Sequence, residues 1–364
     1  MAREVMRFGN LLRMGLFWTL AVMYSYAQLL YQRVLRSGIT FSRVPPSRDK
    51  RRLVCVVTGA SSGIGKATAE ALAVHGYHVI LAGRSKTRLL EVIKILSRKH
   101  ENVSLEAMEL DLSSFRSILS FTTAVKNALE SRGSRGLQLL VNNAGILAGS
   151  QRYTDAGFDS MIATNYLGPY LLTRQLLPIF HNGSPQARIV NVSSFTHRFV
   201  TAGLVDEEHL AQGSLANFPL GKDRYSLAQV YENSKLCMLL FTYELHRHLY
   251  ANSDSSKISV IAADPGVVRT NIMRELPSPL VSLAHFVLRV LRLLQDPFEG
   301  SSAVVDAALA PEGLSGEYFF GGNGRTIKSS AVSYDKNLSE QLWTSSNSLC
   351  NKALTKINEE WIPG

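Results

Sequence analysis

The sequence predicts an α/β protein with a doubly wound parallel sheet of about seven strands, preceded by an N-terminal membrane helix. Three observations predict this. Short apolar runs alternate with helical stretches of ten or more residues along most of the chain. A glycine-rich turn joins the first of these runs to the first helix. An uncharged stretch, residues 14–32, lies between basic flanks near the N-terminus.

The composition bounds the class of function. With 46% hydrophobic and 19% charged residues among 364, the chain is not intrinsically disordered. Its three cysteines exclude a disulfide scaffold and a four-cysteine zinc module, and we expect no metal site. The net charge is +10, but residues 1–52 alone carry +8. A nucleic-acid binder needs clustered charge on its folded domain, so we expect no nucleic-acid partner.

The apolar stretch at residues 14–32 predicts a membrane anchor. It nearly reaches the ~20 residues that a helix needs to cross the bilayer core. Trp18 is typical of membrane interfaces, and Arg13 and Arg33 could reach the headgroups from either end. We therefore interpret residues 1–36 as a retained anchor. A cleaved signal peptide and a buried helix of a soluble protein are the alternatives.

The flanking charges predict the orientation. Residues 33–52 hold seven basic residues, against three before the apolar stretch. The positive-inside rule then places the domain in the cytosol as part of a single-pass membrane protein. The endoplasmic reticulum is a working assumption for the compartment. Residues 37–52 form a basic linker, and residues 351–364 a C-terminal tail after a domain spanning 53–350.

The predicted elements alternate along that domain. The strands are mostly apolar, as in a sheet covered on both faces, and they are residues 53–58, 78–82, 103–111, 137–142, 187–193, 258–263 and 318–320. The helices between them are residues 65–75, 89–99, 158–177 and 231–249. Strands separated by helices of this length form parallel βαβ units.

The glycine-rich turn predicts a dinucleotide site in a Rossmann-type fold. Glycines permit a tight turn and let the backbone approach a pyrophosphate, while the helix N-terminus supplies N–H groups and a positive dipole end. An ordinary strand–helix loop is the alternative. The candidate cofactor-binding residues are Thr58, Gly59, Ser61, Ser62, Gly63, Ile64 and Gly65.

The end of the second strand indicates which dinucleotide binds. An NAD-preferring site places an acid there to hold the ribose 2′-hydroxyl, whereas this chain has Gly83-Arg84-Ser85. The Arg84 guanidinium could bind a 2′-phosphate through two hydrogen bonds. We therefore predict NADP(H) as the cofactor. A solvated loop charge is the alternative for Arg84.

Two later motifs carry groups suited to proton transfer. In Tyr231-Glu-Asn-Ser-Lys235 the tyrosine and lysine share one helical face. An ammonium beside a phenol favours the phenolate and lowers a pKa that is ~10 in water. Tyr231 could then exchange a proton near neutral pH. Ser194, at the end of Asn191-Val-Ser-Ser, could donate a hydrogen bond to a substrate oxygen.

Taken in their order, these motifs resemble the short-chain dehydrogenase/reductase family over most of the chain. The resemblance implies that Tyr231 is the acid/base and that Lys235 also holds the nicotinamide ribose. It further implies that Ser194, rather than Ser193, orients the carbonyl, and that Asn165 completes a water-linked proton relay.

The same resemblance extends the cofactor site. Asp111 and Leu112 would lie near the adenine, with a helix N-cap as the alternative role of Asp111. The Asn-Asn-Ala-Gly motif would border the cofactor, and Thr270 would hold the carboxamide. The further candidates are Asp111, Leu112, Asn142, Ala144, Gly145, Pro265, Gly266 and Thr270.

Other features resemble the retinol-dehydrogenase-like branch of the family, which includes plant FOREVER YOUNG-type oxidoreductases. They are the anchor, Arg84, the separation of Ser194 and Tyr231 by 37 positions, and the segment 338–349. The stretch 277–294 predicts an amphipathic helix that either packs as a lid or touches lipid. Its apolar positions are Leu280, Leu283, Ala284, Val287, Leu291 and Leu294.

The sequence therefore predicts an NADP(H)-dependent oxidoreductase acting on an apolar carbonyl or alcohol, such as a retinoid, a steroid or another lipid-like molecule. The alternative is a catalytically silent cofactor-binding regulator or scaffold at a membrane. Family members often pair through helices around Asn165 and Tyr231, so the resemblance is compatible with a homodimer.

Overall fold

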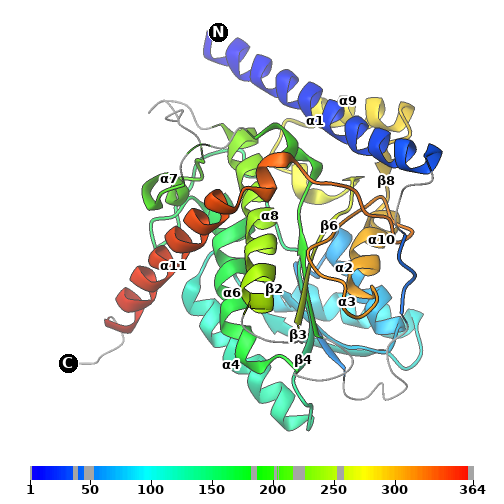
Figure 1. Cartoon of the computed structure of the whole chain (residues 1–364), viewed down its shortest axis with the longest axis vertical. Helices are drawn as coiled ribbons and strands as arrows, with labels where there is room; N and C mark the ends of the chain where they lie inside the picture. Colours follow the sequence, from blue (N-terminus) through cyan, green and yellow to red (C-terminus); the bar gives the residue numbers. More distant parts are fainter. Residues whose placement is uncertain are drawn as a thin grey trace.

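A seven-stranded, all-parallel sheet forms the centre of the molecule (Figure 1), as predicted. The computed structural model describes residues 2–35, 40–44, 53–181, 187–200, 203, 205–215, 226–251 and 258–359. The strand order is β3-β2-β1-β4-β5-β6-β9. The strands are β1 (Val54–Thr58), β2 (His78–Gly83), β3 (Ser104–Glu109), β4 (Leu137–Asn142), β5 (Ala187–Val192), β6 (Ile258–Asp264) and β9 (Tyr318–Phe320).

Helices cover both faces of the sheet and make a single doubly wound domain. One face packs against α2 (Gly63–Val74), α3 (Lys86–Lys99) and α10 (Pro297–Ala308). The other packs against α4 (Phe115–Ser131), α6 (Gly168–Leu176) and α8 (Leu227–Ala251). Outside α8 lies α11 (Lys336–Glu359), which continues past the predicted domain boundary at residue 350. The sequence reading did not anticipate α4 and α10.

The predicted helix 158–177 is interrupted. Asp159 caps α5 (Ser160–Ile162) by accepting hydrogen bonds from two backbone N–H groups. A π-helical turn, η1 (Ala163–Leu167), follows and leads into α6, and η2 (Leu177–Ile179) ends the segment. Single π-helical turns are frequent at functional sites. Asn165 lies in this turn.

Short elements surround the carboxyl ends of the strands. They are η3 (Phe195–Phe199), α7 (Glu207–Ala211), β7 (Val267–Val268), η4 (Asn271–Met273), α9 (Ser278–Val290), β8 (Leu294–Gln295) and η5 (Ala331–Tyr334). The predicted helix 277–294 ends early because Arg292 adopts a left-handed backbone, with φ of 55°. Leu294 instead pairs with Val267 in a small parallel ladder.

A buried arginine ties α10 to the sheet. The Arg188 guanidinium donates hydrogen bonds to the carbonyls of Ala307, Ala308, Ala310 and Pro311 at 2.7–3.1 Å. Such carbonyls at a helix C-terminus lack intrahelical partners and favour a cation. Burial lowers the pKa of Arg188 to about 10, which leaves it charged at neutral pH.

The N-terminal helix α1 (Ala2–Val34) lies across the domain near the carboxyl ends of the strands (Figure 1). Ala21, Val22 and Leu29 are buried in a hydrophobic cluster with residues of β6, β9 and α9. The Ser25 hydroxyl accepts a hydrogen bond from Arg198 Nε at 2.8 Å. One face of α1 is thus part of the core of the domain.

This packing corrects the predicted membrane span. Within the described residues, no helix is long and apolar enough to cross a bilayer. Polar side chains at Thr19, Ser25 and Gln28 interrupt the apolar stretch 14–32, and one face of the helix is covered by the domain. The predicted cytosolic orientation depended on that span and stays a prediction, as do the compartment and the homodimer.

Part of the predicted linker is packed against the domain. The Phe41 amide donates a hydrogen bond to the Gly324 carbonyl at 2.8 Å. Arg43 Nε lies 2.6 Å from Asp306 Oδ1 in an ion pair. Residues 36–39 and 45–52 lie outside the described residues, and so does most of the segment before Tyr231, residues 216–225.

Candidate active site

A cavity of about 700 Å³ opens where the carboxyl ends of the central strands meet, the usual ligand position in such sheets. Of the predicted cofactor residues, all except Asn142 line it. Ser194, Tyr231 and Lys235 line it as well, while Asn165 lies just behind its wall. The topology therefore gathers most of the predicted residues at one site.

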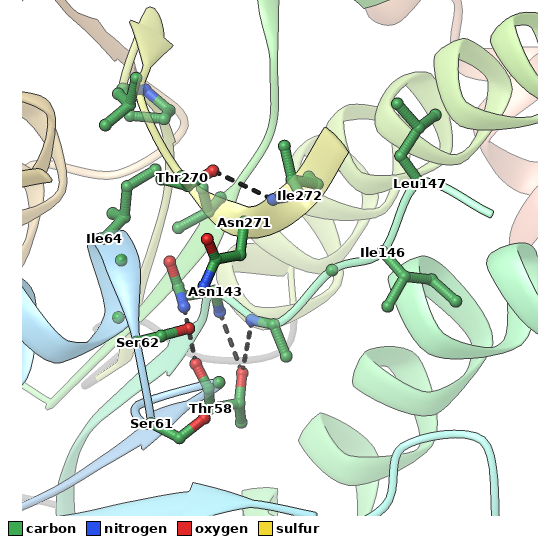
Figure 2. Close-up of a pocket in the computed structure, with 18 of the residues that line it drawn as sticks. Thr58, Ser61, Ser62, Ile64, Asn143, Ile146, Leu147, Thr270, Asn271 and Ile272 are labelled. Atoms are coloured by element: carbon green, nitrogen blue, oxygen red, sulfur yellow. Dashed lines mark hydrogen bonds between the residues drawn. The ribbon is translucent and has the colours of Figure 1, made fainter. Parts of the chain in front are cut away.

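The glycine turn is locked to the loop after β4 (Figure 2). The Thr58 hydroxyl accepts hydrogen bonds from the backbone N–H groups of Asn143 and Ala144, each at 3.0 Å. Asn143 Nδ2 donates to the Thr58 carbonyl at 2.8 Å. A Cβ at Gly65 would lie 2.4 Å from the Gly59 carbonyl oxygen. No larger residue fits at position 65 without moving the turn.

The N-terminus of α2 faces the same cavity. Ser62 occupies the N-cap position without a side-chain hydrogen bond to the helix, and Gly63, Ile64 and Gly65 line the cavity. Uncapped N–H groups and the positive dipole end suit a pyrophosphate. Thr270 lies over the turn, its methyl 3.1 Å from the place of a Cβ on Gly63.

One predicted cofactor residue, Asn142, does not line the cavity, and its neighbour Asn143 does. Asn142 is buried, and its Nδ2 donates to Thr173 Oγ1 at 3.0 Å and to Asn191 Oδ1 at 2.9 Å. Asn142 therefore braces the sheet, whereas Asn143 lines the cavity. Successive side chains along a strand point to opposite faces, so adjacent asparagines at a strand end face different surroundings.

The far end of the cavity is basic. Arg84, at the end of β2, is exposed, and Arg88 of α3 and Lys66 of α2 line the cavity with it. Ser85 caps α3 by accepting a hydrogen bond from the Arg88 amide at 3.4 Å. Glu91, a turn further along α3, is the acid that also lines this end.

Asp111 lines the cavity but uses its carboxylate locally. Oδ1 accepts hydrogen bonds from the Ser113 amide at 2.9 Å and from the Ser113 hydroxyl at 2.7 Å. The N-cap of α4 is Ser114, whose hydroxyl accepts from the Ser117 amide. The alternative role predicted for Asp111 is a helix N-cap. Its carboxylate does bind the segment just before α4, but the N-cap residue itself is Ser114.

Tyr231 and Lys235 project from α8 beside Ser194. The Lys235 ammonium lies 5.6 Å from the centre of the Tyr231 ring and donates to the Val192 carbonyl at 3.2 Å. Ser194 lies near enough to the Tyr231 hydroxyl to oppose the rise in its pKa, and the Ser194 hydroxyl accepts a hydrogen bond from the Thr196 amide at 3.4 Å. The Ser193 hydroxyl instead donates to the Lys235 carbonyl at 2.9 Å. Of the two serines, Ser194 is the one directed at the phenol.

Burial controls the charges at this end of the cavity. It raises the pKa of Tyr231 above its ordinary value, and the nearby Asp264 carboxylate adds to the rise, while the Ser194 hydrogen bond opposes it. Burial also lowers the pKa of Lys235 to about 8, against the effect of Asp264. The pKa of Tyr231 is thus raised where the sequence predicts a lowered one, because burial desolvates the phenolate.

Asn165 holds the loop that follows β4. Its Nδ2 donates to the Ile146 carbonyl at 3.0 Å and to the Ser234 hydroxyl at 3.1 Å, and its Oδ1 accepts from the Ile146 amide at 2.8 Å. A Cβ on Gly145 would lie 3.5 Å from both Asn165 Oδ1 and Lys235 Nζ. The Asn165 and Lys235 side chains therefore both lie against Gly145.

His197 is a positioning residue that the sequence reading missed. Its Nδ1 lies 2.5 Å from the Ser194 carbonyl oxygen, and its Nε2 accepts from the Ser330 amide at 3.1 Å. Because the Ser330 amide is a donor, the imidazole is neutral with its proton on Nδ1. Burial lowers the pKa of His197 to about 3. Nothing in the local pattern distinguishes this histidine.

Comparison with known proteins agrees with this geometry. Residues 53–205 match the family model described as short chain dehydrogenase, and the human protein named Polyprenol dehydrogenase is 36% identical over 325 residues, or 88% of this chain and 90% of that protein. The chain belongs to the short-chain dehydrogenase/reductase family.

Two further likenesses are informative. The Arabidopsis thaliana protein named Dehydrogenase/reductase SDR family member FEY is 35% identical, covering 71% of this chain and 65% of that protein. The predicted resemblance to this branch is confirmed. The solved structure of an uncharacterized protein from Mycobacterium Paratuberculosis has a TM-score of 0.61 and 30% identity, covering 86% of this chain and 98% of its own.

Burial of neutral His197 predicts an acid-sensitive stability. Its folded pKa is depressed, so its contribution is present above the unfolded value of 6.5 and is lost as the pH falls towards the folded value of about 3. Below pH 6.5 the loss is about 1.4 kcal/mol per pH unit. Thermal unfolding at pH 7.5, 6.5 and 5.5 should show a flatter slope for His197→Gln than for the native protein.

The matched control is His75→Gln, which changes a partly exposed histidine at the C-cap of α2 and should keep the native slope. Equal slopes for the native protein and His197→Gln would show that His197 takes up its proton as readily in the folded protein as in the unfolded chain.

Proposed function

We propose that the protein is an NADP(H)-dependent oxidoreductase that interconverts an apolar carbonyl compound and its alcohol. The arrangement that carries this proposal is the cavity with the glycine turn in one wall and Ser194, Tyr231 and Lys235 in another. The turn suits a dinucleotide, and the three side chains suit proton transfer to or from a substrate oxygen.

The residues present fit the cofactor. The uncapped N-terminus of α2 would hold the pyrophosphate, and Arg84 with Arg88 would hold a 2′-phosphate. Thr270 and Lys235 would hold the nicotinamide half. When bound, NADP(H) supplies or accepts the hydride.

The side chains suit the reduction direction. Because burial raises the pKa of Tyr231, the phenol stays protonated at neutral pH and can donate its proton to the substrate oxygen. Ser194 can donate a hydrogen bond to the same oxygen as negative charge develops on it. The Lys235 ammonium then stabilises the phenolate that remains, helped by the Asn165 network that fixes the wall beside it.

An apolar substrate is supported by the surroundings of Tyr231. It belongs to a buried cluster with Leu147, Ala148, Met161 and Val230, against which Ile146, Ile272, Met273 and Leu276 pack. Five of these residues (Ile146, Leu147, Tyr231, Ile272 and Met273) line the cavity. The name of the human relative also points to an isoprenoid alcohol. Retinoids, steroids and isoprenoid alcohols or aldehydes are the classes we propose.

Tyr231→Phe should remove turnover while retaining the ring. We expect kcat with NADPH and all-trans-retinal, long-chain aldehydes or steroid ketones to fall by about 10²- to 10⁴-fold, because the proton donor is gone. The dissociation constant for NADPH, from its fluorescence, should change little. Native protein that binds NADPH without consuming it on any of these substrates would favour a silent regulator instead.

The Arg84→Ser substitution should weaken the binding of NADPH and leave the binding of NADH almost unchanged. A charge-assisted contact to the 2′-phosphate is worth about 1.5–3 kcal/mol, so the Kd for NADPH should rise about 10-fold or more. The Kd for NADH, which lacks that phosphate, should stay within about 2-fold. Fluorescence titration measures both, with exposed Arg135→Ser as the control. Equal losses for the two dinucleotides would assign Arg84 to some other role.

We also propose that the protein binds a lipid surface without spanning it. Exposed apolar side chains follow the outer face of α1 at helical spacing, and they are Leu16, Leu20, Met23, Leu30, Tyr31 and Val34. On α9 the exposed apolar residues are Leu283, Phe286, Val287 and Val290, and Figure 1 shows both helices at one end of the molecule. Exposed Arg33, Arg289 and Arg292 accompany them, a composition typical of interfacial helices on anionic lipid.

Flotation with vesicles containing anionic lipid tests this surface. The double variant Phe286→Asp/Val290→Asp should lose most of its co-flotation, because it puts two charges into the apolar face. Exposed Leu90→Asp on α3 should float like the native protein. Equal flotation of both variants would place the contact elsewhere, and native protein that stays at the bottom of the gradient would refute the proposal.

A further inference from the structure

The N-terminal helix extends to the proposed acid/base. Trp18 Nε1 donates a hydrogen bond to Glu232 Oε1 at 2.6 Å, across 214 positions of sequence. The Trp18 ring centre lies 5.5 Å from that of Tyr231, with the planes at 42°. Trp18 also lines the cavity. A residue of α1 is thus part of the wall beside the phenol.

The hydrogen bond to Glu232 determines which part of the Trp18 side chain is left to contact a ligand in the cavity. Its N–H, the sole polar group of the side chain, is satisfied by Glu232, so the rest of the indole is an apolar surface. That surface packs against the cluster that contains Leu147 and Tyr231. A large rigid aromatic group at this point can position an apolar chain at a low cost in conformational entropy.

Three contacts hold α1 to the segments that carry the other site residues. Glu232, the partner of Trp18, directly follows Tyr231. Arg198, which donates to Ser25, lies in η3, the turn after Ser194. The third contact joins the Tyr26 hydroxyl to Gln295 Nε2 at 2.8 Å. Gln295 belongs to β8, which pairs with β7 just beyond Gly266. The position of α1 is therefore tied to all three segments.

We propose that Trp18 is a specificity-determining residue, whose indole contacts the apolar chain of the substrate next to the reacting carbon. This inference rests on the proposed function and deepens it. It predicts that long or bulky apolar carbonyls need α1, whereas a small carbonyl that ends short of Trp18 does not. Glu232 would act as a positioning residue that holds the indole in place.

Kinetics of the full chain test the specificity. In Trp18→Ala, kcat/KM for all-trans-retinal should fall at least 10-fold, mostly through KM, while kcat/KM for hexanal stays within 2-fold. Trp18→Phe should restore part of the loss. Leu90→Ala, an exposed position of α3 outside both the cavity lining and the proposed lipid surface, should match the native protein. Equal losses for retinal and hexanal, with a weaker NADPH affinity, would mean that Trp18 only supports the fold.

Contact quenching gives a readout that does not need turnover. A dibrominated stearyl alcohol quenches the fluorescence of an indole that it touches. The chain has three tryptophans, Trp18, Trp343 and Trp361. Saturable quenching in the NADPH-bound native protein should disappear in Trp18→Phe, and quenching unchanged in that variant would overturn the inference. Saturable quenching without turnover of any carbonyl would refute the proposed function while supporting Trp18 as a ligand contact.

Discussion

The site is built around one hydroxyl group, that of Thr58, which joins the turn after the first strand to the loop after the fourth. It receives two backbone N–H groups, and in the turn that follows, the Gly59 carbonyl and the Asn143 side chain leave no room for a side chain at Gly65. The loop it holds continues through Gly145 to Ile146, whose amide and carbonyl are both bound by Asn165. Hydrogen bonds from two side chains to this loop therefore hold it between the glycine turn and Lys235.

The sheet was predictable because its strands are short apolar runs separated by helices, and all seven appear where expected. Helix α10 was missed because close packing demands small residues there. A Cβ on Gly300 would lie 2.2 Å from Val268 Cγ2, so the helix lacks the large apolar periodicity that reveals a buried face. Along α9 and the residues after it, all of them described, the predicted apolar face is half exposed and half partly buried, and Leu288 is the buried residue of the helix. Periodicity shows that a face is apolar, and not what covers it.

At the site, residues that follow strands were predictable, because parallel strands all end at one edge. Three features were not. The choice between Asn142 and Asn143 depends on the direction of the last strand residue. His197 and Trp18 matter through partners 133 and 214 positions away. The pKa of Tyr231 depends on its burial by the whole fold, and that burial raises it.

The position of α1 has a consequence for biosynthesis. The binding surface of this helix includes Glu232, in a helix that begins at Leu227, about 200 residues after Trp18. At ~5–20 residues per second, the ribosome needs roughly 10 to 40 s to add that length. During this interval α1, which has two apolar faces, has left the ribosome while the part of the domain that it packs against has not yet been made. Factors that bind nascent apolar helices therefore have access to α1 before the domain does. The packing of α1 onto the domain must follow the synthesis of α8 and belongs to the last steps of folding.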